Sequence, residues 1–202
     1  DNGDYTMIFG FPGSTDRFLT SFGIQEALEQ TNPTIVQIRS EKLAIMKSGM
    51  DANKKTKIQY ASKYAGTSNY WKYYIGQSRG LKRMKVYDKK VEIENKFTDW
   101  VNSGDEQRYE KFGNTLSLIE EAYEDNRELN ISRTYLNEAI FQGAEIMYFS
   151  FIMNRKLANI PTDKEEKTMF MNEITEEAKE FYKNYNSTID EELFSAMLEM
   201  YY

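Results

Sequence analysis

Apolar residues recur at helical spacing along most of the chain, and this pattern constrains the fold more than any other feature of the sequence. Tyr109, Phe112, Leu116, Ile119 and Tyr123 alternate in steps of three and four residues, which places all five on one face of an α-helix. Similar stripes continue from about residue 23 to the C-terminus, and only 3 of the 202 residues are Pro. The sequence therefore predicts a mainly α fold, an antiparallel bundle of six or seven helices.

Three stretches of this pattern give more specific expectations. Pro33 suits the first turn of a helix, with Asn32 as its N-cap. Thr162 and Glu165 predict a capping box at the start of a later helix. Residues 132–158 are apolar on nearly every face, which predicts a buried central helix. If no neighbouring helix covered it, its exposed apolar surface could drive formation of a homodimer.

The first 22 residues differ from the rest of the chain. Residues 4–9 are rich in β-branched and aromatic side chains and precede a Gly/Pro turn at residues 10–13, which predicts a short β-strand. A single strand is not stable alone, because its edges need hydrogen-bonding partners. It either forms a hairpin with residues 17–22 or belongs to a sheet outside this chain. We therefore divide the chain into residues 1–22, a strand and turn, and residues 23–202, a helical domain that could be truncated at its C-terminus.

The chain contains neither Cys nor His. Without Cys it cannot form a disulfide or a thiolate nucleophile, and without His it cannot hold a complete Ser-His-Asp triad or the usual catalytic zinc site. We expect no metal and no cofactor. The most apolar stretch, residues 146–153, is far shorter than the about 20 residues that a membrane span needs, so no span is expected. The first residues show neither a charged n-region nor an apolar h-region, so we expect no signal peptide within this sequence.

Charge is unevenly distributed along the chain, whose net charge is −6. Residues 53–90 contain 11 Lys and Arg but a single acid, Asp88, and aromatic residues lie among the bases, including Tyr60, Tyr64, Tyr70, Trp71, Tyr73 and Tyr74. Three interpretations stay open: a mixed surface packed beside the acidic second half, a nucleic-acid-binding surface, or a cationic wall that attracts acidic peptides or other anions. An acidic chain lacks the usual basic footprint of a nucleic-acid-binding protein, so we expect no nucleic acid as partner.

Three motifs in the first 83 residues resemble a known family. They are Gly-Phe-Pro-Gly-Ser-Thr at residues 10–15, the stretch at residues 58–72 that ends in Asn69-Tyr70-Trp71-Lys72, and Ile-Gly-Gln-Ser-Arg-Gly-Leu-Lys-Arg at residues 75–83. In combination they resemble the bacterial serine dipeptidyl-peptidases, which are periplasmic or surface-associated exopeptidases that include Asp/Glu-specific and hydrophobic-specific enzymes. The match is dense from about residue 4 to residue 86, and beyond it only the helical pattern is compatible.

The resemblance implies a specific architecture and activity. Family members hold their Ser-His-Asp triad in a chymotrypsin-like double β-barrel, with a helical domain inserted that caps the cleft. Residues 1–22 would then be the edge of that barrel, and residues 23–202 the cap. The parent enzyme would release dipeptides from the free N-terminus of oligopeptides, in the periplasm or at the cell surface, whereas this chain alone would be inactive. The basic segment weakly favours the Asp/Glu-specific type.

One site residue follows from the resemblance. In the family, the Asn of the Asn-Tyr-Trp-Lys motif contacts the α-amino group of the substrate, and here this residue is Asn69. An amide oxygen accepts a hydrogen bond from an ammonium without introducing a charge. The competing interpretation makes Asn69 a helix cap or turn residue after Gly66-Thr67-Ser68. Trp71 and Tyr73 could line the cleft, although aromatics at helical spacing more often belong to a core.

A second hypothesis is a different class of protein. The chain could be a non-catalytic helical interaction module that grips an anionic partner through the basic and aromatic segment 53–90, with no catalysis anywhere in the parent. Acid pairs such as Glu120-Glu121 and Glu176-Glu177 look like solvated helix faces, and with no His beside them we do not assign them to a catalytic or metal site.

Overall fold

Helices make up nearly all of the chain that the structure describes, which confirms the mainly α prediction. This computed structural model describes residues 3, 5, 7, 9–10 and 15–202. In chain order the elements are α1 (Ser21–Glu26), η1 (Ala27–Thr31), α2 (Asn32–Ala52), α3 (Lys54–Arg83), α4 (Val86–Asn102), α5 (Glu106–Phe112), α6 (Thr115–Tyr135), η2 (Leu136–Phe141), α7 (Glu145–Leu157), α8 (Lys164–Lys183) and α9 (Ser187–Tyr201), where η1 and η2 are π-helical. None of the described helices is long and apolar enough to cross a membrane.

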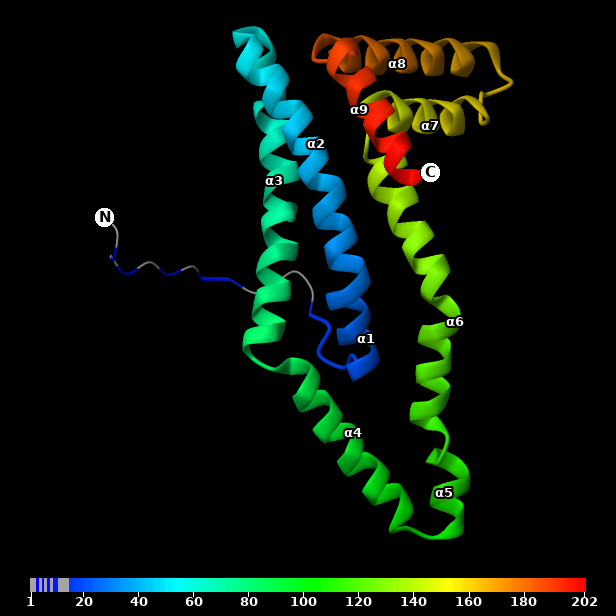
Figure 1. Cartoon of the computed structure of the whole chain (residues 1–202). Coiled ribbons are helices and arrows are strands. Elements are labelled where there is room, and N and C mark those ends of the chain that lie inside the picture. The colour runs from blue at the N-terminus through cyan, green and yellow to red at the C-terminus, as the bar shows by residue number, and fades with distance from the viewer. Residues whose placement is uncertain (1–2, 4, 6, 8, 11–14) are drawn as a thin grey trace.

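The α2–α3 pair is the frame of the fold. The two helices run antiparallel and side by side over most of their length (Figure 1). The tight turn between them depends on Asn53, whose side chain accepts hydrogen bonds from the backbone N–H groups of Lys55 (2.8 Å) and Thr56 (3.4 Å). These bonds satisfy donors that the first turn of a helix otherwise leaves free, so α3 starts at a defined residue.

The core forms where α9 packs against this frame. Leu193 of α9 is fully buried with Met46 of α2 and Tyr60 of α3, and a smaller cluster places Met197 against Ile38. The helices approach closely because residue 49 is Gly: a Cβ there would lie 2.4 Å from the Ile189 Cδ1 atom. The core therefore joins segments about 150 residues apart in the sequence and fixes α9 on the α2–α3 pair.

The chain between these parts forms an extended arm. Figure 1 shows α4 and α5 leading away from the α2–α3 pair and α6 returning toward it. Helices α7, α8 and α9 lie together at the end of α6 that is opposite to α5. Glu94 of α4 links the arm to the start of α1. Its carboxylate accepts hydrogen bonds from the Ser21 backbone N–H (2.6 Å) and hydroxyl (2.5 Å). The stripe from Tyr109 to Tyr123 is divided between α5 and α6, which are separated at Gly113 and Asn114.

The predicted N-terminal hairpin is wrong. Ser21 and Phe22, assigned to its second strand, form the first turn of α1, and no strand occurs among the described residues. Of the predicted first strand, Asp4, Thr6 and Ile8 lie outside the described residues, as do positions 11–13 of the Gly/Pro turn. Within residues 17–22 the helix begins at Ser21, where Glu94 accepts the hydrogen bonds of the α1 N-terminus.

The prediction of one buried central helix over residues 132–158 is also wrong. The helix breaks between η2 and α7, and no residue of α7 is fully buried. Gly143 marks the break, since a Cβ there would lie 1.8 Å from the Ala139 carbonyl oxygen. Pro33 lies in the first turn of α2 as predicted, but Asn32 is the first residue of that helix rather than its N-cap, because α2 continues directly from η1. The Asn32 amide is buried instead and donates to Gln77 (2.9 Å) and Ser78 (3.0 Å) of α3.

Candidate functional site

Asn69 lies in the middle of α3 with its side chain exposed. The helix runs unbroken from Lys54 to Arg83, so Asn69 is neither a cap nor a turn residue, and the competing interpretation of this residue is wrong. The Asn69 amide takes no part in the hydrogen bonds formed among residues 15–202. An exposed Asn in a helix interior slightly disfavours the helix. Asn69 therefore has no structural role in the described chain, and its amide is available to a ligand.

The neighbours of Asn69 divide between structural and exposed positions. Trp71 is half-buried, and its indole N–H donates to the Ser40 hydroxyl of α2 at 2.7 Å, which fixes the rotation of α3. Tyr70 and Tyr73 are 55% and 54% exposed. Tyr73 packs edge-on against Tyr74, with ring centroids 5.2 Å apart. Trp71 thus supports the helix, whereas Tyr70 and Tyr73 form an aromatic surface around Asn69.

A cavity of about 490 Å³ lies beside this surface, between α2, α3 and η2. It is lined by Arg39, Lys42, Gly66, Thr67, Tyr70, Tyr74, Glu138 and Gln142. A Cβ at Gly66 would meet no other atom within 4 Å, so this wall is open. Because Tyr70 directly follows Asn69, the cavity and the candidate amine contact occupy the same turn of α3.

The charged groups of this cavity are held by specific partners. The Arg39 guanidinium forms an ion pair with the Glu138 carboxylate (Nε–Oε2 2.7 Å and Nη2–Oε1 2.9 Å) and lies over the Tyr70 ring, 5.5 Å from its centroid. The Lys42 ammonium donates to the Gln142 carbonyl oxygen. Burial and the neighbouring Arg39 charge lower the pKa of Lys42 from 10.5 to about 8.

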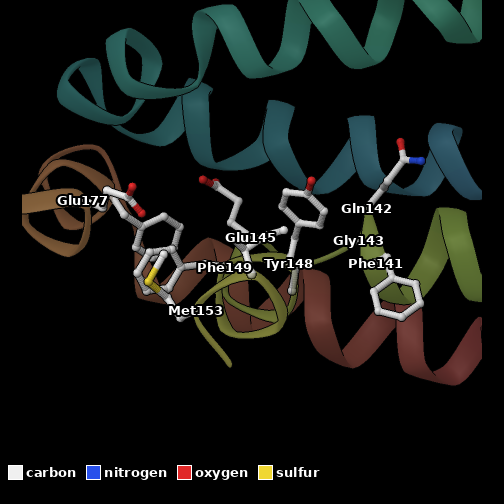
Figure 2. Close-up of a pocket in the computed structure, with 11 residues that line it drawn as sticks. Phe141, Gln142, Gly143, Glu145, Tyr148, Phe149, Met153 and Glu177 are labelled. Carbon is white, nitrogen blue, oxygen red and sulfur yellow. The ribbon is translucent and has the colours of Figure 1, made fainter. Parts of the chain in front are cut away.

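A second, apolar groove of about 650 Å³ runs along α7 and α8. Phe149 of α7 stacks on Phe181 of α8, with centroids 4.0 Å apart and rings 10° from parallel. Figure 2 shows Glu145 and Tyr148 pointing from α7 toward the α2 side, whereas Phe141 points the other way. Glu145 pairs with Lys63 of α3 (2.6 Å), and Glu177 pairs with Lys156. The groove therefore offers aromatic surface rather than free charge.

The basic segment 53–90 corresponds to α3 and the start of α4. Of its 11 basic side chains, Lys63 alone forms an ion pair within the part of the chain that the structure describes. The helix packs mainly on α2, and Lys63 pairs with Glu145 of the acidic second half. Across residues 15–202 and the five described residues before them, no group of three or more acidic side chains is placed to hold a metal ion.

The sequence predicts Asn69 as a site residue, which stays a prediction, but it did not predict the cavity. Arg39, Lys42 and Glu138 come from segments about 100 residues apart, and no local motif marks them. The one sequence signal is Lys42 itself, a cation among the apolar residues Ile38, Leu43 and Met46 of α2. A cation beside a core stripe needs a polar environment from another element.

Comparison with known proteins matches the whole chain to one family. The model of the family described as Peptidase S46 matches residues 1–202. Dipeptidyl-peptidase 7 of Porphyromonas gingivalis is 36% identical over 98% of this chain and 26% of its own length. The Asp/Glu-specific dipeptidyl-peptidase of Flavobacterium psychrophilum is 32% identical over 98% of this chain and 28% of its own length. The chain thus spans about a quarter of the length of these curated relatives.

Solved structures share the fold. A crystal structure of Porphyromonas endodontalis DPP11 superposes with a TM-score of 0.73 at 24% identity, over 95% of this chain and 27% of that protein. A second structure of the same protein, in complex with the dipeptide Arg-Glu, gives a TM-score of 0.69 at 22% identity over 95% of this chain and 27% of that one. The arrangement of helices is therefore an established one.

Proposed function

The chain belongs to the Peptidase S46 family, and from this premise we propose that it is the helical cap of a parent serine dipeptidyl-peptidase. The parent would release dipeptides from the free N-terminus of oligopeptides, with its triad in the remaining sequence. Residues 1–22 would join the cap to the catalytic β-barrel, and the enzyme would act in the periplasm or at the cell surface. The names of the relatives favour this proposal over a non-catalytic interaction module.

The observation that carries the proposal is the free amide of Asn69 on the open surface of α3. A substrate ammonium offers three donors, and the Asn69 carbonyl oxygen can accept one of them. At a fixed distance from the catalytic serine, this acceptor would set the length of the released fragment at two residues. Peptides with a blocked N-terminus would leave the acceptor unpaired, which disfavours them.

Cleavage by the parent polypeptide tests this role. We expect it to cut a peptide with a free N-terminus and to leave the acetylated peptide intact. Asn69→Ala should lower kcat/KM for the free peptide about 10- to 150-fold, the range expected for a hydrogen bond to a charged group. Asn95→Ala removes an equally exposed amide from α4 and should leave kcat/KM unchanged. An unchanged kcat/KM in Asn69→Ala would contradict the role of Asn69, and cleavage of neither peptide would contradict the peptidase proposal.

The side chain that the parent prefers is a separate question. Relatives at 36% and 32% identity carry the names dipeptidyl-peptidase 7 and Asp/Glu-specific dipeptidyl-peptidase, so identity favours neither specificity strongly. The cationic surface of α3 would attract acidic peptides over distances of about the Debye length. If that attraction matters, kcat/KM for acidic peptides falls as salt rises.

A further inference from the structure

Lys42 is the one charged group of the cavity beside Asn69 whose charge no carboxylate neutralises within the described chain. Arg39 and Glu138 neutralise one another through their ion pair, whereas the Lys42 ammonium has only the Gln142 carbonyl oxygen as partner. The lining of the cavity therefore carries one uncompensated positive charge. A half-buried ammonium without a counter-ion is costly, which makes this a place where an anion would bind favourably.

The acids nearest Lys42 are each engaged elsewhere. Glu145 at the start of α7 pairs with Lys63, and Asp190 of α9 accepts the backbone N–H groups of Glu145 (2.5 Å) and Ile146 (3.0 Å). With Glu138 they favour the charged form of Lys42, yet burial and Arg39 outweigh them and lower its pKa to about 8. Burial is the largest cause of this lowered pKa, and no carboxylate forms a direct ion pair with Lys42 in the described chain.

The shape and remaining lining of the cavity fit a carboxylate ligand. A volume of about 490 Å³ lies within the range of small-molecule sites and accommodates an acidic side chain or a short dicarboxylate. Thr67, Tyr70 and Tyr74 line the α3 side of the cavity and offer hydroxyl groups, and Gly66 leaves that wall open. The Tyr74 hydroxyl is protonated at neutral pH, and burial raises its pKa further, so it can donate a hydrogen bond to a carboxylate.

We propose that this cavity is a carboxylate-binding site in which Lys42, supported by Arg39, holds an acidic group of a peptide. The peptide origin rests on the proposed function, which places the peptide N-terminus at Asn69, one residue from Tyr70 along α3. The carboxylate preference rests on the cavity alone. A free dicarboxylate shares the same chemistry, and the experiment distinguishes the two sources.

The test uses the parent polypeptide and two probes, N-acetyl-glutamate amide and its neutral counterpart N-acetyl-glutamine amide. Acetylation removes the ammonium, so Asn69 contributes nothing to the binding of either probe. By calorimetry at pH 7 we expect the glutamate probe to bind about 10-fold more tightly than the glutamine probe, as expected for a charged hydrogen bond. Lys42→Met should abolish this preference, and Lys42→Arg should keep most of it.

Controls separate this site from the amine contact. Lys57→Met removes an exposed cation from α3 and should keep the preference, as should Asn69→Ala. Equal binding of the two probes to the wild type, or an unchanged preference in Lys42→Met, would overturn the proposal. If Asn69→Ala has no effect on cleavage but the preference for glutamate holds, the amine proposal fails and the carboxylate site stands.

Two further measurements complete the design. If succinate displaces the glutamate probe, a free dicarboxylate is sufficient for binding at this site. If succinate does not compete with the glutamate probe, the site is assigned to peptides. If Lys42→Met fails to fold, the wild type still gives an answer: the preference for glutamate should disappear between pH 7 and pH 9.5, as Lys42 loses its proton. A preference that persists at pH 9.5 would overturn the role of Lys42.

Discussion

The α2–α3 pair and the α7–α8 pair are both antiparallel helical hairpins, yet they are stabilised differently (Figure 1). In the first, buried side chains such as Ile38, Met46 and Tyr60 face a core that α9 completes. In the second, no residue of either helix is fully buried, and the Phe149–Phe181 stack and the Lys156–Glu177 ion pair join the helices. The first pair is a rigid frame, whereas the second keeps apolar surface available for contact.

The difference has a functional consequence. Asn69 and the carboxylate cavity both lie on the frame, so a ligand there meets groups held by a packed core. The α7–α8 pair reaches the frame through the Lys63–Glu145 ion pair and through Asp190 at the α7 N-terminus. With few buried contacts of its own, it should open locally at a lower free energy than the frame.

Truncation of the core should have the largest effect. Leu193→Ala removes a fully buried side chain between α2, α3 and α9 and should lower the free energy of unfolding by about 3–4 kcal/mol. The matched change on the other pair, Phe149→Ala, removes a half-buried ring and should cost about 1 kcal/mol. Urea unfolding followed by circular dichroism measures both values. Equal losses of unfolding free energy in the two variants would mean that the α2–α3 and α7–α8 pairs are equally well packed, which would contradict the difference described between them.

Asp190 should have the next largest effect, confined to one region. Its carboxylate accepts two backbone N–H groups at the start of α7 and the Tyr185 hydroxyl (3.1 Å), so Asp190→Ala leaves these donors unpaired. We expect a loss of about 2–3 kcal/mol. Amide hydrogen exchange should accelerate in α7 and α8 far more than in α2 and α3.

Asp190→Asn provides the control for that prediction, because it keeps one oxygen acceptor with nearly the same shape. It should therefore cost less than Asp190→Ala and accelerate exchange less. Exchange that rises uniformly over the whole chain in Asp190→Ala would show that α7 and α8 unfold together with the frame.

The sequence predicted helices wherever the apolar period was clear, and the role it suggests for Asn69 stays a prediction. It did not show where those helices break, because a single Gly or a cap one residue away sets a helix boundary without changing the apolar period. Gly143 sits within an apolar run that reads as continuous, and the stop is imposed by the close approach of Ala139. The predicted capping box of α8 is likewise replaced by Asp163, which accepts from the Glu165 and Glu166 N–H groups.

Burial was harder to predict than helix formation. Residues 146–153 are the most apolar stretch of the chain, yet α7 lies partly exposed. The hydrophobicity of a segment does not show which other helices pack against it. The carboxylate cavity depends on Lys42, Arg39 and Glu138 meeting across about 100 residues, which periodicity within one helix cannot reveal. In the sequence, nothing distinguishes Asp190 from other acids in the first turn of a helix. In the structure it is buried, and it accepts hydrogen bonds at the start of α7 rather than in its own helix, α9.

The remaining prediction concerns pH and the frame alone. Burial and Arg39 lower the pKa of Lys42 from 10.5 to about 8, so between these values the unfolded chain holds a proton that the folded chain has released. The free energy of unfolding therefore rises with pH in this window, by about 2 kcal/mol from pH 8 to pH 10. Below pH 8 both states are protonated, and Lys42 contributes no slope. Urea unfolding at intervals of half a pH unit measures the curve.

Above pH 10 two tyrosines should reverse the trend. Burial raises the pKa of Tyr185 to about 12 and also raises that of Tyr60, so the unfolded chain ionises first and stability falls. Lys42→Met should remove the rise between pH 8 and pH 10 but keep the fall above pH 10. A bound carboxylate would give Lys42 its counter-ion, raise its pKa and flatten the same rise in the wild type. A wild-type curve that is flat or falling from pH 8 to pH 10 without ligand would contradict an uncompensated Lys42 in the frame.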